Sequence, residues 1–157
     1  MDLSIKIEDY VLNIRAGAVI IHNNKVLLHR NMNEDHHAIL GGRVSIGESS
    51  EETIKREILE ELGKKIEITG YVATIENFFE MKNSKYHEIM FIHRAEFCDE
   101  EDKLIVDTIH NIEGRKELIY EWVDINELDK INLAPTSMIE ILKKGNFPVH
   151  KIHNELK

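Results

Sequence analysis

A short segment of the chain concentrates acidic side chains beside one another. It reads REILEELG over residues 56–63 and contains Glu57, Glu60 and Glu61. Like charges three or four positions apart on a helix repel each other by roughly 0.2–0.5 kcal/mol per pair. Either these carboxylates are solvated on a surface helix, or a cation lies among them.

The pattern around this segment predicts a helix that begins after Ser49 and ends before Gly63. Ser49 and Glu52 have the spacing of a capping box, and glycine commonly follows the last turn of a helix. Apolar residues recur at positions 54, 58 and 62 and form one stripe. Such a helix packs one face against a core.

Helical rotation brings the three glutamates to the border of that stripe. At about 100° per residue, Glu57 and Glu61 lie one turn apart at the edge of the buried face, and Glu60 projects to the same side. Partly buried carboxylates either raise the pKa of one another or stay charged around a cation. A ligand set made only of oxygens favours a hard divalent ion such as Mg²⁺ or Mn²⁺.

An ordinary amphipathic helix with a solvated acidic face is the alternative, and composition alone favours it. The glycines that precede the helix weigh against that alternative. Gly41, Gly42 and Gly47 predict a tight loop between strand fragments, where a bent backbone can approach an ion or a phosphate.

The remaining elements are strands with one further helix. A terminal helix and strands on both sides of a central helix indicate a mixed α+β or α/β layered domain. The expected segments are a hairpin at 15–30 that turns at Asn23-Asn24, a second hairpin from 66–79 and 85–97, mostly loop at 99–116, a strand at 117–124, and a helix between Pro135 and Gly145.

Composition narrows the classes of partner. A formal charge of -9 without a basic block argues against binding to nucleic acid. The N-terminus has no signal-peptide pattern, and no apolar run is long enough to cross a membrane, so the cytoplasm is the expected location. Cys98 is the single cysteine, which rules out a disulfide framework or a thiolate metal cluster and is expected to be a packed, inert thiol.

The acidic segment and its flanks resemble the Nudix box of MutT-like and ADP-ribose pyrophosphatase-like hydrolases. That pattern is G-x5-E-x7-R-E-U-x-E-E-x-G-U, where U is a bulky aliphatic residue. Gly42, Glu48 and the segment 56–63 fit it at fixed spacing, and the box occupies residues 42–64. Eight defined positions match, so chance is a poor explanation.

Two positions depart from the family pattern. Lys64 stands where the last aliphatic residue is expected, and Ile66 can supply that packing instead. Leu40 stands where many members have a proline before the two glycines. Neither change touches a ligand, so both bear on loop geometry and not on chemistry.

The resemblance covers most of the chain and implies both a fold and an activity. The implied fold is an α/β/α sandwich with a mixed β-sheet, in one domain over residues 1–157. Family members use Mg²⁺ or Mn²⁺ to cleave a nucleoside diphosphate linked to another moiety X, by attack of water at phosphorus. The identity of X stays open, so the substrate could be ADP-ribose, a nucleoside triphosphate, a nucleotide sugar or a dinucleoside polyphosphate. A homodimer is a further expectation from the family.

The same resemblance assigns roles to the box residues. The implied metal ligands are Glu57, Glu60 and Glu61, joined by the Gly42 carbonyl and, through water, by Glu48. Arg56 would orient the glutamates through an ion pair with Glu48 or Glu57.

The general base is less tightly specified by the resemblance. We favour Glu60, with Glu57 as the other candidate inside the box. Carboxylates outside the box that border the second hairpin or the following loop are Glu76, Glu80, Glu88, Glu100 and Glu101.

Three residues are candidates for binding the substrate: Arg30 and Arg43, which could contact a phosphate, and Glu76. A surface arginine at a strand end is the competing interpretation for both arginines. His36 and His37 are expected in a loop, with His37 at the mouth of the site.

Aromatic and histidine side chains elsewhere have competing interpretations. Phe78, Phe79 and Trp122 could stack on a base, although core packing is favoured for Trp122. For His87 a structural hydrogen bond is favoured over catalysis.

Two other functions are compatible with a Nudix-type fold. One is a non-catalytic nucleotide-binding or regulatory module, which the retained box glutamates argue against. The other is an isomerase of isopentenyl diphosphate, which would need a reactive cysteine beside the site. Cys98 is poorly placed for that role.

Overall fold

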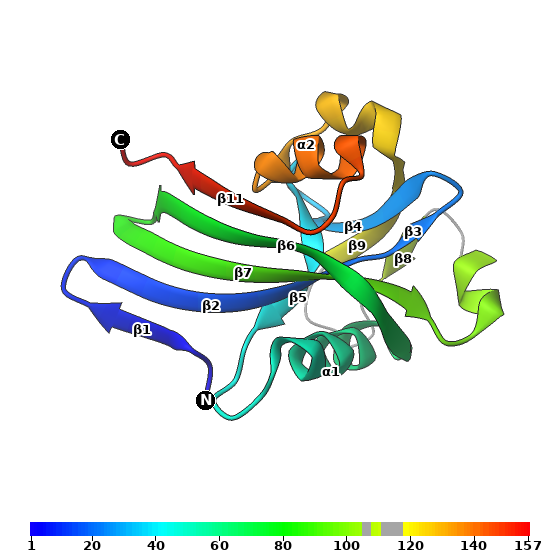
Figure 1. Cartoon of the computed structure of the whole chain (residues 1–157), viewed down its shortest axis with the longest axis horizontal. Coiled ribbons are helices and arrows are strands. Elements are labelled where there is room, and N and C mark those ends of the chain that lie inside the picture. The colour runs from blue at the N-terminus through cyan, green and yellow to red at the C-terminus, as the bar shows by residue number, and fades with distance from the viewer. Residues whose placement is uncertain (105–107, 111–117) are drawn as a thin grey trace.

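The computed structural model describes residues 1–104, 108–110 and 118–157. Within these residues eleven strands join in one strongly curved mixed sheet. Its main path runs β11-β6-β7-β2-β5-β4-β9-β8, with β1 paired to β2, β3 to β4, and β10 to β5. Figure 1 shows the sheet between α1 on one side and α2 on the other.

The strands are β1 (Ser4–Ile7), β2 (Tyr10–Val19), β3 (Ile21–His22), β4 (Lys25–Asn31), β5 (His37–Arg43), β6 (Ile66–Met81), β7 (Ser84–Phe97), β8 (Thr108–His110), β9 (Leu118–Asp124), β10 (Leu133–Ala134) and β11 (Val149–Asn154). The helices are α1 (Ser50–Leu62) and α2 (Ser137–Lys144), with 3-10 turns η1 (Glu100–Leu104) and η2 (Ile125–Lys130).

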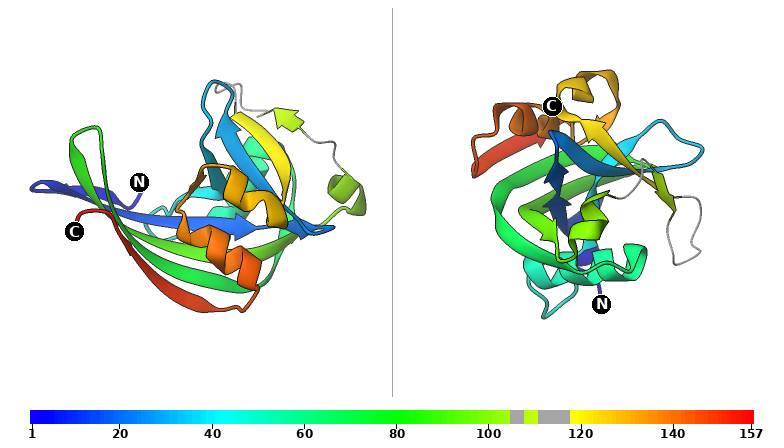
Figure 2. Two further views of the ribbon diagram at one scale, coloured as in Figure 1. Left: turned by 90° about the horizontal axis from the view of Figure 1, so that it is seen from above. Right: turned by 90° about the vertical axis from the view of Figure 1, so that its right-hand side faces the viewer.

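Two hydrophobic cores separate the layers. The α1-side core packs Ile54, Ile58 and Leu62 of the predicted apolar stripe against buried residues of β2 and β5. The α2-side core packs Met138 and Leu142 of α2 against the opposite face of the sheet. Figure 2 shows the same layers from two further directions. The predicted α/β/α sandwich with a mixed sheet is confirmed.

The second predicted hairpin is confirmed, and the first is only partly correct. β6 and β7 pair from Ile66 to Phe97 and turn at residues 82–83, where both backbones have positive φ. Asn23 and Asn24 also form a turn with positive φ, but this turn joins β3 to β4. β2 instead runs through the middle of the sheet, parallel to β7 and antiparallel to β1 and β5. The backbone N–H and C=O groups on both edges of a long apolar strand find hydrogen-bond partners only when the strand lies between two others.

The predicted glycine loop is wrong for Gly41 and Gly42, which belong to β5 and pair with β2. Gly41 has φ +148, and a Cβ on it would lie 2.0 Å from the Ala16 carbonyl oxygen. The two strands approach so closely that no larger residue fits there. Gly47, with φ +83, is the glycine that lies in the loop before α1.

The other elements agree with the sequence patterns in most places. β9 and α2 match the predicted strand and helix, and Gly145 ends α2 in the left-handed conformation. The segment 99–116 holds η1 and β8, so its described part is less of a loop than expected; residues 105–107 and 111–116 lie outside the described residues. Neither α1 nor α2, nor any other helix in the described ranges, combines the length and apolar character that crossing a membrane requires.

Candidate active site

Local signals fix α1 at both ends. The Ser49 hydroxyl accepts from the Glu52 amide at 3.2 Å, and the Ser49 amide donates to the Glu52 carboxylate at 2.7 Å. The capping box is therefore confirmed. Gly63 ends the helix with φ 65, in the left-handed conformation that glycine adopts without strain. These caps fix where the helix begins and ends, and the packing of Ile54, Ile58 and Leu62 fixes which way its glutamates point.

Arg56 lies among the carboxylates and contacts three of them. Its Nε and Nη2 donate to the two Glu48 oxygens at 2.8 and 2.9 Å. Its Nη1 donates to Glu57 at 2.7 Å and reaches Glu60 at 3.4 Å. Both expected partners, Glu48 and Glu57, are thus engaged. These hydrogen bonds hold the pKa of Glu48 at about 2, so Glu48 is ionised at any physiological pH.

Glu57 lies directly against the backbone of Gly42. A Cβ added to Gly42 would lie 2.4 Å from the Glu57 carboxyl carbon and within 2.8 Å of both its oxygens. Only glycine leaves this space for the carboxylate. Burial raises the pKa of Glu57, and the charges of Arg56 and Arg15 oppose that rise. A further cation beside this carboxylate would favour its ionised form.

Glu60 and Glu61 lie in different surroundings. The Glu60 side chain is 46% exposed, which is more than the 18% of Glu57. Glu61 is intermediate and accepts a hydrogen bond of 2.6 Å from the hydroxyl of Tyr120, a buried residue of β9. The α1-side core therefore reaches the acidic face of the helix through Tyr120, which orients one carboxylate of the box.

The ligands predicted from the sequence carry only oxygen donors, the type that a hard divalent cation prefers. They are the carboxylates of Glu57, Glu60 and Glu61, the Gly42 backbone beside Glu57, and Glu48 behind Arg56. Within the described part of the chain, no three acidic, histidine or cysteine side chains already converge as a metal cluster. The guanidinium of Arg56 currently provides the positive charge between Glu57 and Glu60.

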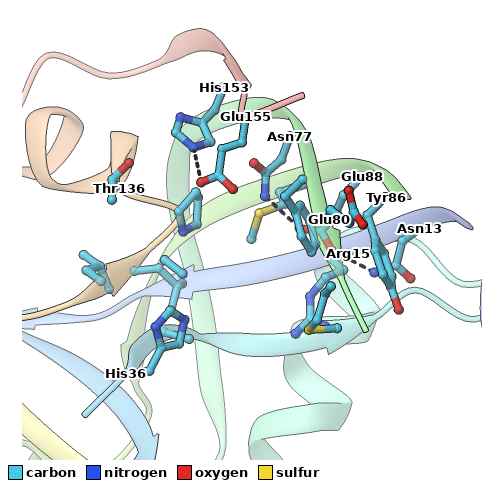
Figure 3. Close-up of a pocket in the computed structure, with 18 of the residues that line it drawn as sticks. Asn13, Arg15, His36, Asn77, Glu80, Tyr86, Glu88, Thr136, His153 and Glu155 are labelled. Atoms are coloured by element: carbon cyan, nitrogen blue, oxygen red, sulfur yellow. Dashed lines mark hydrogen bonds and ion pairs between the residues drawn. The ribbon is translucent and has the colours of Figure 1, made fainter. Parts of the chain in front are cut away.

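A pocket of about 460 Å³ opens on the face of the sheet opposite α1. It is bounded by β2, β5, β6, β7, the segment 132–136 and the end of β11 (Figure 3). Arg15 and Arg43, a directly paired couple on β2 and β5, both line it. Because Arg43 follows Gly42 on a strand, the two residues face opposite sides of the sheet. The pocket and the glutamate helix therefore meet at the β2–β5 pair.

The substrate-binding candidates lie in different places. Arg43 lines the pocket, and its nearest anionic partner, Asp2, is 4.0 Å away. Arg30 donates to Glu121 at 2.9 Å and does not line the pocket. Glu76 also lies outside the pocket lining and contacts His150 at 2.7 Å, because it points to the other face from its neighbour Asn77.

Among the carboxylates proposed as a base outside the box, Glu80 and Glu88 line the pocket. Glu100 and Glu101 lie in η1, away from the pocket lining. The structure thus brings Glu57 and Glu60 together with Arg56, whereas Glu80 and Glu88 line the pocket.

Several expectations for histidine and cysteine need correction. His37 is buried and contacts Glu121 at 2.9 Å, so it is not at the mouth of the site; its neighbour His36 lines the pocket instead. Cys98 is exposed, not packed, and does not line the pocket. An isomerase that depends on a thiol beside the site therefore has no support.

The aromatic side chains fall into two groups. Phe79 lines the pocket and stacks on Tyr86 at 4.8 Å between ring centroids. Trp122 packs against the α1-side core, as expected. Phe78 contacts the ring of His87 at 4.4 Å. Phe79 is thus the aromatic candidate with access to a ligand in the pocket.

Sequence reasoning missed Arg15, Tyr120, Asn13 and Asn77. Asn13 and Arg15 interrupt the apolar run at 11–21, and polar residues in a central strand need a partner or a ligand. That interruption of the apolar run could have identified Asn13 and Arg15 as candidates from the sequence. Tyr120 could not be found this way, because its contact with Glu61 joins residues 59 positions apart.

Comparison with known proteins finds a matching family model and similar solved structures. The family model described as NUDIX domain matches residues 12–144. A solved UDP-X diphosphatase is 22% identical, with a TM-score of 0.60, over 88% of this chain and 66% of that one, just under two thirds of its length. An ADP-ribose pyrophosphatase from Streptococcus suis is 14% identical, with a TM-score of 0.61, over 88% and 98% of the two chains. A MutT protein from Bacillus halodurans is 23% identical, with a TM-score of 0.57, over 83% and 80%.

Proposed function

The chain belongs to the NUDIX family, and its structural neighbours include a UDP-X diphosphatase and an ADP-ribose pyrophosphatase; we propose that it is a metal-dependent pyrophosphohydrolase of nucleotide derivatives. Its substrate would be a nucleoside diphosphate linked to another moiety, cleaved by attack of water at phosphorus. The observation that carries this proposal is the Glu57 carboxylate held against Gly42 beside Arg56.

The metal would be Mg²⁺ or Mn²⁺. Glu57, Glu60 and Glu61 would hold it with the Gly42 carbonyl, and Glu48 would act through water. When bound, such an ion neutralises phosphate oxygens and activates water. The half-buried Glu57 supports this assignment, because burial raises its pKa and a divalent ion would keep it ionised.

Protein groups would orient the ligands and the substrate. Arg56 holds Glu48 and Glu57 in fixed positions through its three nitrogens. Arg43 and Arg15 line the neighbouring pocket, where their charge would attract a phosphate. Glu60, the most exposed carboxylate of the group, would accept a proton from water.

The test is a panel of ADP-ribose, nucleoside triphosphates, nucleotide sugars and dinucleoside polyphosphates, assayed with Mg²⁺ and with Mn²⁺. The products identify the bond that is cleaved. In Glu57→Gln we expect kcat/KM to fall by about a hundredfold or more, and Mn²⁺ binding, measured directly by electron paramagnetic resonance, to weaken. Glu51→Gln, on the exposed first turn of the same helix, is the matched control and should behave as the wild type.

Two results would contradict the proposal. One is turnover that is unchanged by removing the metal with a chelator. The other is tight nucleotide binding with no product from any member of the panel, which would indicate a binding module. A Glu57→Gln variant with wild-type Mn²⁺ affinity would show that the ligand assignment is wrong even if the protein is a hydrolase.

A further inference from the structure

Three polar side chains form a row across the floor of the pocket. Asn13 on β2 is paired in register with Glu88 on β7, and Glu88 is paired with Asn77 on β6. All three are more than nine-tenths buried, with exposed fractions of 2%, 6% and 7%. All three also line the pocket (Figure 3). The sheet therefore places a carboxylate between two amides at the base of a cavity.

The amides hold the carboxylate in place. Asn13 Nδ2 donates to Glu88 Oε2 at 2.8 Å, and Asn77 Nδ2 approaches Glu88 Oε1 at 3.4 Å. The remaining oxygens, Asn13 Oδ1 and Asn77 Oδ1, are buried and have no hydrogen-bond partner. Within residues 1–104, 108–110 and 118–157, no lysine, arginine or histidine forms an ion pair with Glu88.

Burying these polar groups costs free energy unless a ligand or solvent supplies the missing hydrogen bonds. A buried carboxylate and unpaired amide oxygens lose the hydrogen bonds that water would give them. The two atoms of the row that have no partner at all, Asn13 Oδ1 and Asn77 Oδ1, are acceptors, so the group that would satisfy them is a donor. The nearest charged residue on the same face of β2 is Arg15, two positions along the strand from Asn13, and Arg43 is its register partner on β5. The pocket thus places hydrogen-bond acceptors next to cationic side chains.

A ligand that matches both sets of side chains carries N–H donors and an anionic group such as phosphate. The stacked rings of Phe79 and Tyr86 also line the pocket, and their flat surfaces favour a planar aromatic group over a sugar. We propose that Glu88 is a specificity-determining residue that accepts a hydrogen bond from the amino group of a nucleobase. Asn13 and Asn77 position its carboxylate.

This inference builds on the proposed function, because it concerns the moiety that the hydrolase recognises. Its test measures binding and not turnover, so the two can fail separately. The probes are matched nucleoside diphosphates that differ in an exocyclic amino group: CDP with UDP, ADP with IDP, and GDP with IDP. Affinities are measured by isothermal titration calorimetry, for the wild type, Glu88→Gln and Glu155→Gln.

For the wild type, we expect the amino-bearing member of at least one pair to bind about tenfold to a hundredfold more tightly. Glu88→Gln should reduce that preference to about threefold or less, while the affinity for the partner without the amino group stays similar. Glu155→Gln removes another carboxylate that lines the same pocket, and should keep the wild-type preference.

Equal affinity within every pair for the wild type would overturn the inference without any variant. A preference that persists in a folded Glu88→Gln, checked by circular dichroism, would overturn it as well. If no substrate is ever hydrolysed but the preference is lost in Glu88→Gln, the recognition role stands and the proposed hydrolysis does not.

Discussion

Gly42 offers the sharpest test of how the backbone positions Glu57, the carboxylate proposed to bind the metal. A Cβ at this position would lie 2.4 Å from the carboxyl carbon of Glu57, whereas ordinary contacts begin near 3.4 Å. In Gly42→Ala the Glu57 carboxylate must therefore retreat by about 1 Å. Because Gly42 needs no positive φ, the strand itself accepts alanine without backbone strain.

A displacement of about 1 Å in a metal ligand or reacting group costs about a hundredfold in rate. We therefore expect kcat/KM of Gly42→Ala to fall by about that factor with the best substrate of the panel, and Mn²⁺ to bind more weakly. The matched control is Gly70→Ala on β6, where the added Cβ would meet only Arg94 Cβ, at 3.8 Å. Circular dichroism and thermal unfolding establish that both variants fold.

The result that refutes this reasoning is a folded Gly42→Ala whose kcat/KM stays within about threefold of the wild type. Glu57 would then either move without consequence or have no part in the reaction. Equal losses in Gly42→Ala and Gly70→Ala would also refute it, since a general effect on the sheet would explain both.

Two further predictions concern the residues behind the glutamate helix. Tyr120→Phe removes the hydroxyl that donates to Glu61 at 2.6 Å, so we expect Mn²⁺ affinity to fall by about tenfold; unchanged affinity would mean that Tyr120 does not orient the ligand. Burial, with a smaller contribution from the charge of Arg15, lowers the pKa of His29 to about 4. Because the unfolded chain binds that proton at higher pH, stability should fall as the pH drops, by about 2 kcal/mol between pH 7 and pH 5. Urea unfolding of His29→Phe at both pH values should show a correspondingly smaller loss, and an identical loss would assign the dependence to other groups.

The helix α1 was predictable because its signals are local. The capping pair, the apolar stripe and the terminal glycine all lie within fifteen residues, and each acts on the helix that contains it. The position of Glu57 and Glu61 at the border of the core follows from rotation alone. The departure from the family pattern at Lys64 leaves the packing intact. Ile66 is buried in the α1-side core, as expected, and Lys64 forms an ion pair with Asp102.

The glycines show where local reasoning stops. Two adjacent glycines between short apolar segments indicate a loop on sequence grounds. In the structure they let β5 approach β2 and make room for Glu57, and both contacts come from elsewhere in the chain. One partner of Glu88 is equally remote, since Asn13 is 75 positions away, whereas Asn77 lies in the predicted hairpin. The pairing of β2 with β7, which local patterns do not specify, completes the floor of the pocket.

The paired strands β2 and β5 also determine how recognition can be coupled to chemistry. Gly42 contacts Glu57 on one face, while its neighbour Arg43 lines the pocket on the other. Arg15, paired with Arg43, lines the pocket, and its charge opposes in small part the rise in the pKa of Glu57 that burial causes. A ligand whose phosphate lies between these arginines would reach both the acceptor floor and the glutamate helix. Because the floor residues lie on β2, β6 and β7 whereas Glu57 lies on α1, substitutions at the floor should alter which base binds and leave the geometry around Glu57 intact.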